Sequence, residues 1–172
     1  MPFFAVPLLL AAAAPLSPRA APLPTPSPTR LRADVAAMVG FGTRHTASIT
    51  TDPKRGIGAA RTWAAHRFTE IGATCGGCIT VERVARTFTG PRAPTGVIVE
   101  DVLGIQKGRD PNRVVIVGAH IDSRVTDVMN VTADAPGAND NASGVALVLE
   151  AAPDALSFAP GASAVTFITS VT

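Results

Sequence analysis

Charge is scarce in this chain of 172 residues: Asp, Glu, Lys and Arg together make up 16%, and the formal net charge is +2. No run of five or more like charges occurs. Nucleic-acid proteins concentrate basic residues in a patch, so no nucleic-acid partner is expected. A long apolar run is missing too, because Phe3–Ala14 is too short for an ordinary transmembrane helix. Hydrophobic residues nevertheless make up 47%, which predicts one domain with one buried core.

The amino-terminal region has the pattern of an export signal followed by a linker. The apolar stretch Phe3–Ala14 leads into small residues, as in a secretory signal peptide, although no basic residue precedes it. We therefore expect a signal peptide at residues 1–21 and a secreted or periplasmic protein. Residues 22–30 are rich in proline and predict an extended linker, which leaves residues 31–172 as the folded domain.

Cysteine is also rare, with only Cys75 and Cys78, spaced as Cys-Gly-Gly-Cys. A redox motif of thioredoxin type would need a strand that leads straight into a helix, whereas this pair follows a predicted helix. A zinc site would need two more ligands nearby. With an export signal in front, a local disulfide explains the pair best, and its very short loop limits its effect on stability.

The apolar pattern predicts both helices and strands. Helical spacing occurs in three segments, namely residues 31–40, 57–71 and 145–156. Strand patterns occur in four segments, namely residues 79–84, 97–105, 114–117 and 164–168. Pro153 should kink the last helix, and Pro91 and Pro94 should lie in a loop. The continuous run Val114–Val117 suits a strand buried on both faces. From Val114 onward the order strand, loop, helix, strand indicates a βαβ unit, and therefore an α/β fold with parallel pairing.

A histidine and a carboxylate follow directly on this buried strand, in the segment Gly-Ala-His120-Ile-Asp122-Ser. In open α/β sheets, ligands bind beyond the carboxyl ends of the strands. Asp122 lies two residues after His120, so in extended backbone both side chains point to the same side. The carboxylate could then accept the second ring N–H of His120 and make the other nitrogen a better metal donor. Standing alone, however, a His-x-Asp sequence is common and has no function in most proteins.

A third candidate, Asp140, stands at the start of the last predicted helix, in Ala-Pro-Gly-Ala-Asn-Asp140-Asn-Ala-Ser-Gly. Pro136 and Gly137 predict a turn before it, and Asn141 and Ser143 could cap the helix. A carboxylate at this point could bridge two metal ions about 3.5–4 Å apart. The plainer interpretation is that Asp140 is itself a helix cap.

Taken together, these two segments resemble the co-catalytic zinc exopeptidases of metallopeptidase family twenty-eight, which includes bacterial aminopeptidases and aminopeptidase Y. The resemblance extends to Phe41-Gly-Thr-Arg-His45-Thr and to the helix around Trp63. It implies a three-layer α/β/α zinc-exopeptidase (phosphorylase/hydrolase-like) fold. It also implies that His120 binds one zinc ion, that Asp140 bridges two, and that Asp122 belongs to the catalytic machinery by orienting His120.

The resemblance further implies an aminopeptidase that acts on peptide substrates with two zinc ions and a bridging water. In the family, a Gly-Glu-Glu segment after the next strand supplies the general base and a further ligand. The strand at Ala164–Ile168 is followed by Thr169–Thr172, where that segment would begin. We therefore expect an amino-terminal part of the peptidase domain that is inactive by itself.

Three alternatives remain open at this point. Relatives of the fold include ectodomains without activity, which would serve as binding domains, and acyl-transferring cyclases of glutaminyl-cyclase type, which use one zinc ion. A truncated product that folds poorly is the third alternative, since its last strand would leave an unprotected edge.

Four other polar residues are expected to have structural or solvated roles. His45 should make a structural hydrogen bond, and His66 should be exposed on a polar helix face. Asp127 and Asp134 lie in the long loop, where a calcium ion is conceivable but solvated carboxylates are the rule.

Overall fold

The computed structural model describes residues 25–110, 112–155 and 164–170. Within these ranges, the chain forms three α-helices and a four-stranded sheet. The helices are α1 (Pro28–Gly40), α2 (Gly56–Thr74) and α3 (Ser143–Ala151), and the strands are β1 (Thr80–Gly90), β2 (Ala93–Lys107), β3 (Val114–His120) and β4 (Ala164–Ser170). The signal peptide expected at residues 1–21 lies outside the described residues.

The sheet has the strand order β1-β2-β4-β3. Strands β1 and β2 form an antiparallel hairpin, and β4 runs antiparallel to β2. Strands β3 and β4 are parallel, with His120 level with Ser170. Helix α3 lies between these two strands in the sequence, so the predicted βαβ unit and the α/β class are confirmed.

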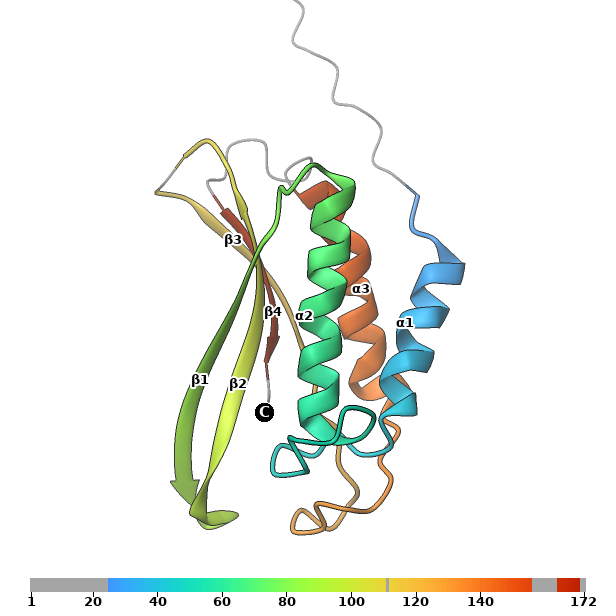
Figure 1. Cartoon of the computed structure of the whole chain (residues 1–172), viewed down its shortest axis with the longest axis vertical. Helices are drawn as coiled ribbons and strands as arrows, with labels where there is room; N and C mark the ends of the chain where they lie inside the picture. Colours follow the sequence, from blue (N-terminus) through green and yellow to red (C-terminus); the bar gives the residue numbers. More distant parts are fainter. Residues whose placement is uncertain (1–24, 111, 156–163, 171–172) are drawn as a thin grey trace, which may run out of the picture.

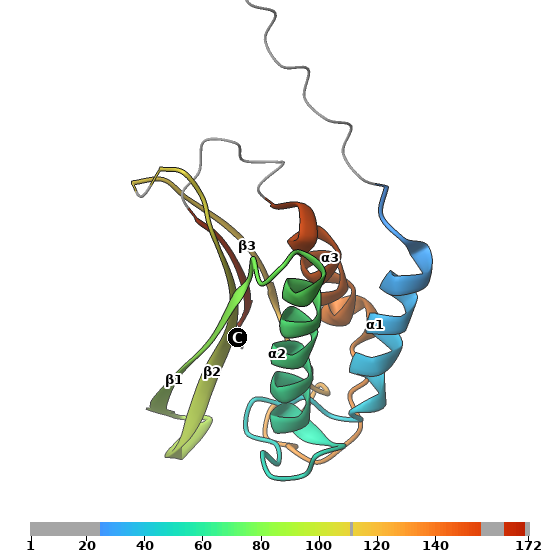
Figure 2. The same ribbon diagram turned by 45° about the horizontal axis from the view of Figure 1, so that its top comes forward.

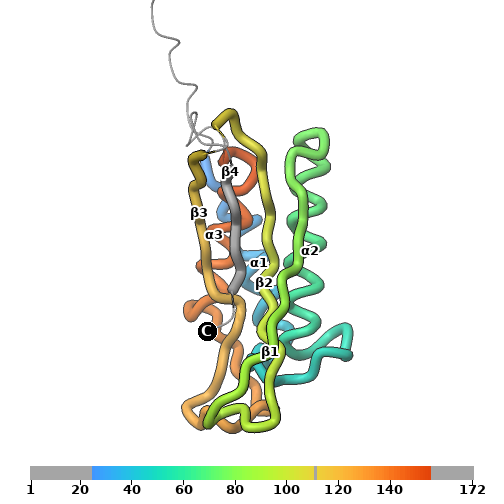
Figure 3. Tube along the Cα trace, turned by 90° about the vertical axis from the view of Figure 1, so that its left-hand side faces the viewer, coloured from blue at the N-terminus to red at the C-terminus, as the bar shows by residue number. Residues whose placement is uncertain are grey.

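All three described helices lie on the same face of the sheet (Figures 1 and 2), and Figure 3 shows the sheet in front of them. The core fills the space between the two layers, where Met38, Phe68 and Val102 are fully buried. The described residues thus form two layers of the expected three-layer fold. Consequently, the expectation that β3 is buried on both faces is wrong: Val114 and Ile116 are 59% and 63% exposed, because alternate side chains point away from the helices.

Helix α1 begins earlier than expected, at Pro28, inside the segment predicted as linker. Proline suits the first turn of a helix, since its missing N–H would have no partner there. Ser27 is the N-cap residue, and its hydroxyl accepts a hydrogen bond from the Arg30 N–H at 3.3 Å. The helix ends at Gly40 as predicted.

Helix α2 follows the predicted apolar stripe, and each residue of that stripe is buried. These residues are Ile57, Ala60, Ala64, Phe68 and Ile71. The helix runs on past Gly72 to Thr74. Here Gly72 packs closely on Ile79, the residue before β1, since a Cβ at Gly72 would lie 3.2 Å from Ile79 Cβ.

Pro153 lies in the short turn η2 (Ala152–Asp154) that follows α3, which confirms that it interrupts the helix. Pro94 is part of β2 rather than a loop, near the point where the hairpin register shifts; proline is tolerated at such irregularities. Cys75 and Cys78 form the predicted disulfide. Of the helices in the described ranges, none is long and apolar enough to cross a membrane.

Candidate metal centre

The predicted site residues gather at the carboxyl end of β3. There the loop after α1, residues 41–55, and the loop after β3, residues 121–137, lie side by side at one end of the molecule (Figures 1 and 2). His120 is the last residue of β3. The loop 121–137 follows, and the helical turn η1 (Ala138–Ala142) then leads into α3. The edge of the sheet predicted to hold the site therefore does bring His120, Asp122 and Asp140 together.

The first contact in this site joins His120 to Asp122, with 3.0 Å between Nδ1 and Oδ1. Asp122 is only 6% exposed, and the Thr46 hydroxyl donates to its other oxygen, Oδ2, at 3.3 Å. A carboxylate only accepts hydrogen bonds, so we assign the ring N–H to Nδ1. The lone pair of the neutral imidazole is then on Nε2, which is the arrangement expected for a metal-binding histidine.

The second contact joins Nε2 of His120 to Oδ1 of Asp140 at 3.0 Å. Two atoms that both carry lone pairs face one another here, and a proton or a cation between them removes their repulsion. Zinc takes imidazole nitrogen and carboxylate oxygen, and two ligands of one tetrahedral zinc ion lie about 3.3 Å apart. The donor pair therefore fits a zinc ion. Nowhere in the described ranges are three or more His, Cys, Asp or Glu side chains placed to hold a metal ion.

Asp140 reaches this position because η1 departs from helical geometry, with φ −120° and ψ 91° at Asp140. Its carboxylate is 88% exposed and faces His120, which argues against the simple capping role. Asn141 does cap α3 as predicted, since its Oδ1 accepts the Gly144 N–H at 3.0 Å. The capping role predicted for Ser143 is wrong, because its hydroxyl donates to the Asn139 carbonyl instead.

A cavity of about 450 Å³ opens above these side chains. It is bounded by His120, Asp122, residues 123–126 and Asp140. This volume lies within the range of small-ligand sites in proteins. The exposed Asp140 carboxylate and the partly exposed His120 ring therefore face a space that a ligand can enter.

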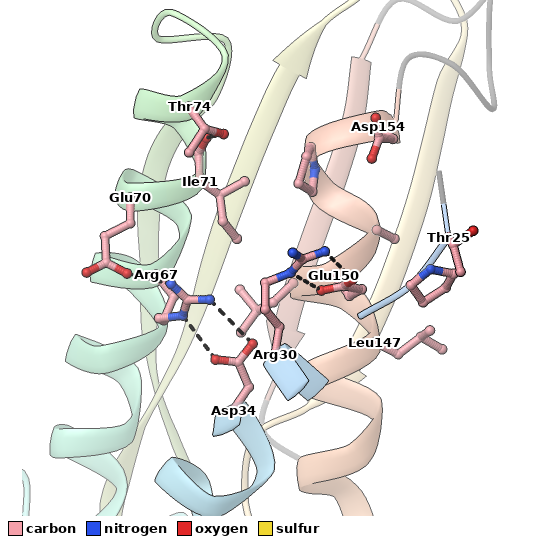
Figure 4. A pocket seen from close by; sticks show the side chains of 14 residues that line it. Thr25, Arg30, Asp34, Arg67, Glu70, Ile71, Thr74, Leu147, Glu150 and Asp154 are labelled. Atoms are coloured by element: carbon pink, nitrogen blue, oxygen red, sulfur yellow. Dashed lines mark hydrogen bonds and ion pairs between the residues drawn. The ribbon is translucent and has the colours of Figure 1, made fainter. Parts of the chain in front are cut away.

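Another cavity, of about 480 Å³, lies between α1, α2 and α3 (Figure 4). Two ion pairs between helices lie among its lining residues. Arg30 Nη2 lies 2.6 Å from Glu150 Oε1, and Arg67 Nε lies 3.0 Å from Asp34 Oδ1. These two pairs tie α1 to α3 and to α2, so they help to hold the helix layer together.

Sequence reasoning missed Arg44, which is fully buried beside the candidate metal centre. Burial lowers the pKa of its guanidinium to about 10, so the group stays charged at neutral pH. Its side chain donates to main-chain carbonyls, among them that of Ile121 at 2.8 Å. Because these partners are backbone groups, no residue pattern distinguishes Arg44 from the other arginines.

His45 and His66 have the environments expected from the sequence. His45 Nδ1 accepts from the Ala47 N–H at 3.0 Å, and its Nε2 lies 3.1 Å from the Val128 carbonyl. Both ring nitrogens are thus engaged by backbone, which confirms a structural role. The His66 side chain is 71% exposed and pairs with Glu70 one helical turn away.

The two loop aspartates have local partners as well. Asp134 Oδ1 lies 2.6 Å from Arg55 Nη2. Asp127 Oδ1 accepts a hydrogen bond from the Met129 N–H at 2.9 Å. Their contacts shape the loop, and no calcium role is proposed for them.

Residues 101–170 match the model of Peptidase family M28. A curated relative from Pyricularia oryzae, described as a probable zinc metalloprotease, is 52% identical over 132 residues, which cover 73% of this chain and 25% of that protein. The chain thus spans about a quarter of the length of that relative. The matched residues 101–170 include all three candidate site residues.

Solved structures of two enzymes share the fold. A Zn-dependent exopeptidase from Parabacteroides distasonis has a TM-score of 0.60 and 23% identity, over 85% of this chain and 47% of that one. A glutaminyl cyclase from Fimbriiglobus ruber has a TM-score of 0.61 and 22% identity, over 92% of this chain and 49% of that one. At these identities the likeness establishes the fold, which is the predicted zinc-exopeptidase fold. Residues 101–170, with the strand, loop and helix that present His120, Asp122 and Asp140, therefore belong to peptidase family M28.

Proposed function

We propose that this chain carries part of the zinc centre of a metallo-exopeptidase, an aminopeptidase that removes amino-terminal residues from peptides. The observation that carries the proposal is the imidazole of His120, held between two carboxylates at 3.0 Å each. Asp122 engages one ring nitrogen, and Asp140 faces the other. The family match and the zinc metalloprotease description of the relative from Pyricularia oryzae support zinc as the metal.

Each of the three side chains has a separate task in the proposed centre. His120 Nε2 and Asp140 Oδ1 would hold zinc, with Asp140 bridging to a second ion. Asp122 keeps the Nδ1–H of His120 hydrogen-bonded and so fixes the ring orientation, while Thr46 holds Asp122 in turn. Zinc, when bound, would lower the pKa of a coordinated water and polarise the peptide carbonyl.

A catalytic zinc ion has three protein ligands as a rule, and the described residues supply two. We therefore expect the 172-residue chain to bind zinc weakly and to hydrolyse aminoacyl substrates slowly or not at all. Robust, chelator-sensitive turnover of an aminoacyl chromogenic substrate by this chain would contradict that expectation.

Zinc titration by calorimetry tests the centre directly. His120→Ala should abolish binding, and Asp140→Asn should weaken it about tenfold or more. His66→Ala is a matched control, because His66 also pairs with a carboxylate, at 3.1 Å, but on the exposed face of α2. The proposal fails if the wild-type chain binds no zinc, or if His120→Ala and His66→Ala bind it equally well.

A second candidate function is a single-zinc acyltransferase of the glutaminyl-cyclase type, because such cyclases share the fold with a TM-score of 0.61. The number of zinc ions separates the two. Measured on a longer version of the protein that supplies the remaining ligands, a second zinc equivalent that is lost in Asp140→Asn favours the aminopeptidase, whereas saturation at one equivalent favours the cyclase.

A further inference from the structure

Three separate segments meet directly behind the candidate metal centre. They are the loop 41–46 after α1, the residues 121–123 after β3, and the turn 135–137 before η1. Two backbone hydrogen bonds join them: the Ser123 N–H donates to the Arg44 carbonyl at 3.3 Å, and the Ala135 N–H donates to the Gly42 carbonyl at 3.0 Å. Asp122 lies in the second of these segments, His120 directly precedes that segment, and Asp140 follows the third segment by three residues.

The side chain of Arg44 spans all three segments and the end of α1. Nε donates to the Ile121 carbonyl at 2.8 Å, between His120 and Asp122 in the sequence. Nη1 donates to the Pro136 carbonyl at 2.8 Å, and Nη2 donates to the Gly137 carbonyl at 3.1 Å. Nη1 also donates to the Met38 carbonyl, in the last turn of α1, at 2.9 Å.

These bonds use the forked shape of the guanidinium group, which presents five donors in one plane. A lysine at the same place would offer a single ammonium, which can reach one or two of the four carbonyls. Arg44 is fully buried, and the burial of a charge is unfavourable unless it is well hydrogen-bonded. Four bonds to carbonyls, together with the nearby charge of Asp122, offset that cost.

The segments are packed too closely at this point for a larger residue. A Cβ on Gly137 would lie 2.6 Å from the Ser123 Cβ and 3.0 Å from Arg44 Nη2, and the φ angle of Gly137 is +45°. Ser123 adds another link, because its hydroxyl donates to the Ala135 carbonyl at 2.5 Å and accepts from the Arg44 N–H at 3.3 Å. The contact between residues 121–123 and residues 135–137 is thus both hydrogen-bonded and close-packed.

We propose that Arg44 is a positioning residue of the metal centre, which holds the segment of His120 and Asp122 at a fixed distance from the turn that leads to Asp140. This inference rests on the proposed function, since it assigns Arg44 a role in zinc affinity. The 3.0 Å contact between His120 Nε2 and Asp140 Oδ1 joins two residues that flank the segments linked by Arg44. Weakening Arg44 should therefore separate the two ligands without removing either of them.

The test compares Arg44→Lys with Arg67→Ala in the 172-residue chain. Arg67 also pairs with carboxylates, but in the helix layer away from the metal centre. Two quantities are measured: amide hydrogen exchange in residues 120–123 and 135–140, and the zinc dissociation constant. We expect Arg44→Lys to speed exchange in both segments and to weaken zinc binding about tenfold or more, as substitutions behind metal ligands do. Arg67→Ala should leave both quantities within about twofold of wild type.

The outcomes separate this inference from the proposed function. If wild type binds zinc and Arg44→Lys binds it equally well, or if exchange in the two segments is unchanged, Arg44 has no positioning role while the zinc centre stands. If wild type binds no zinc, the proposed function fails, and with it the role of Arg44 in affinity. If Arg44→Lys does not fold, Arg44→Gln takes its place: glutamine buries no charge, can donate to at most two of the four carbonyls, and should speed exchange in residues 120–123 and 135–140. Unchanged exchange in Arg44→Gln would overturn the inference.

Discussion

The two faces of the sheet differ sharply, although the same strands build both. On the face that carries the helices, Phe68 and Val102 are fully buried, and Val117 packs against this core. On the opposite face, Val114 and Ile116 of the same β3 strand are more than half exposed. An apolar strand sequence therefore does not decide burial in this chain; the position of the helix layer does. Exposed apolar surface of this kind is a common site of association between proteins.

The largest expected effect on stability comes from a comparison of two phenylalanines, one on the helix-covered side of the sheet and one exposed. Phe68 on α2 is fully buried, whereas Phe88 near the end of the hairpin is 52% exposed. Phe68→Ala should lower the free energy of unfolding by about 3–5 kcal/mol, through lost burial and the cavity left behind. Phe88→Ala should lower it by well under half of that. Urea denaturation of both variants measures the difference, and equal losses would mean that the helix layer does not define the core.

Gly104 and Gly90 provide a second comparison, because they differ in the space available for a side chain. A Cβ at Gly104 would lie 2.7 Å from the Phe68 ring, whereas a Cβ at Gly90 meets nothing within 4 Å. Gly104→Ala should therefore destabilise the chain by about 1–3 kcal/mol, because β2 and α2 must move apart. Gly90→Ala should change the unfolding free energy by less than about 0.5 kcal/mol. A neutral Gly104→Ala variant would show that the contact between β2 and α2 is looser than the structure indicates.

Charges on the helix layer should matter less than the apolar contacts beneath it. Hydrogen bonding to Arg30 lowers the pKa of Glu150 below its ordinary value of 4.5, and Figure 4 shows this pair. The pair thus stabilises the fold above pH 4.5, and the effect is lost as the pH falls through the lowered folded-state pKa. Arg30 is largely exposed, so solvent screening should keep this contribution small.

Calorimetric unfolding at neutral pH and near pH 3 measures this contribution. Glu150→Gln should lose less stability on acidification than wild type does. The control is Glu82→Gln, on the exposed hairpin, which should follow the wild-type acid dependence. If Glu150→Gln and wild type lose the same stability on acidification, the ion pair does not stabilise the helix layer.

The smallest change in stability is expected on the open face. The double variant Val114→Thr/Ile116→Thr keeps β-branched side chains and so preserves strand propensity. Its melting temperature should stay within about 2 °C of wild type, while binding of a hydrophobic fluorescent dye should fall. Val148→Thr on α3, where the side chain is 2% exposed, should lower the melting temperature clearly, because it buries a hydroxyl. If the double variant binds as much dye as wild type, the dye does not bind at Val114 and Ile116, and these side chains do not form an accessible apolar surface.

The spacing of residues along the chain predicted those features of the site and fold that involve residues close together in the sequence. The contact of His120 with Asp122 follows from two-residue spacing in extended backbone, and the buried stripe of α2 follows from helical spacing. The disulfide between Cys75 and Cys78 has the same local origin. The approach of Asp140 to His120 depends on the path of the loop 121–137, and only family resemblance pointed to it.

Two features could not be predicted from residue patterns. The bonds of Arg44 go to backbone carbonyls, which every residue carries, so its role appears only when the loops are placed in space. The exposure of Val114 and Ile116 could not be foreseen either, because a continuous apolar run is the same whether one or both faces of its strand are covered.

Helix α1 is fastened at both of its ends. At its start, the Ser27 N–H and the Arg30 side chain both bond to Glu150 of α3. At its end, the Met38 carbonyl accepts from Arg44. Terminal turns of helices ordinarily fray, because their outer backbone groups lack partners. In α1 both terminal turns have partners in other elements, so the amides of this helix should open together in one cooperative event and not by fraying from one end.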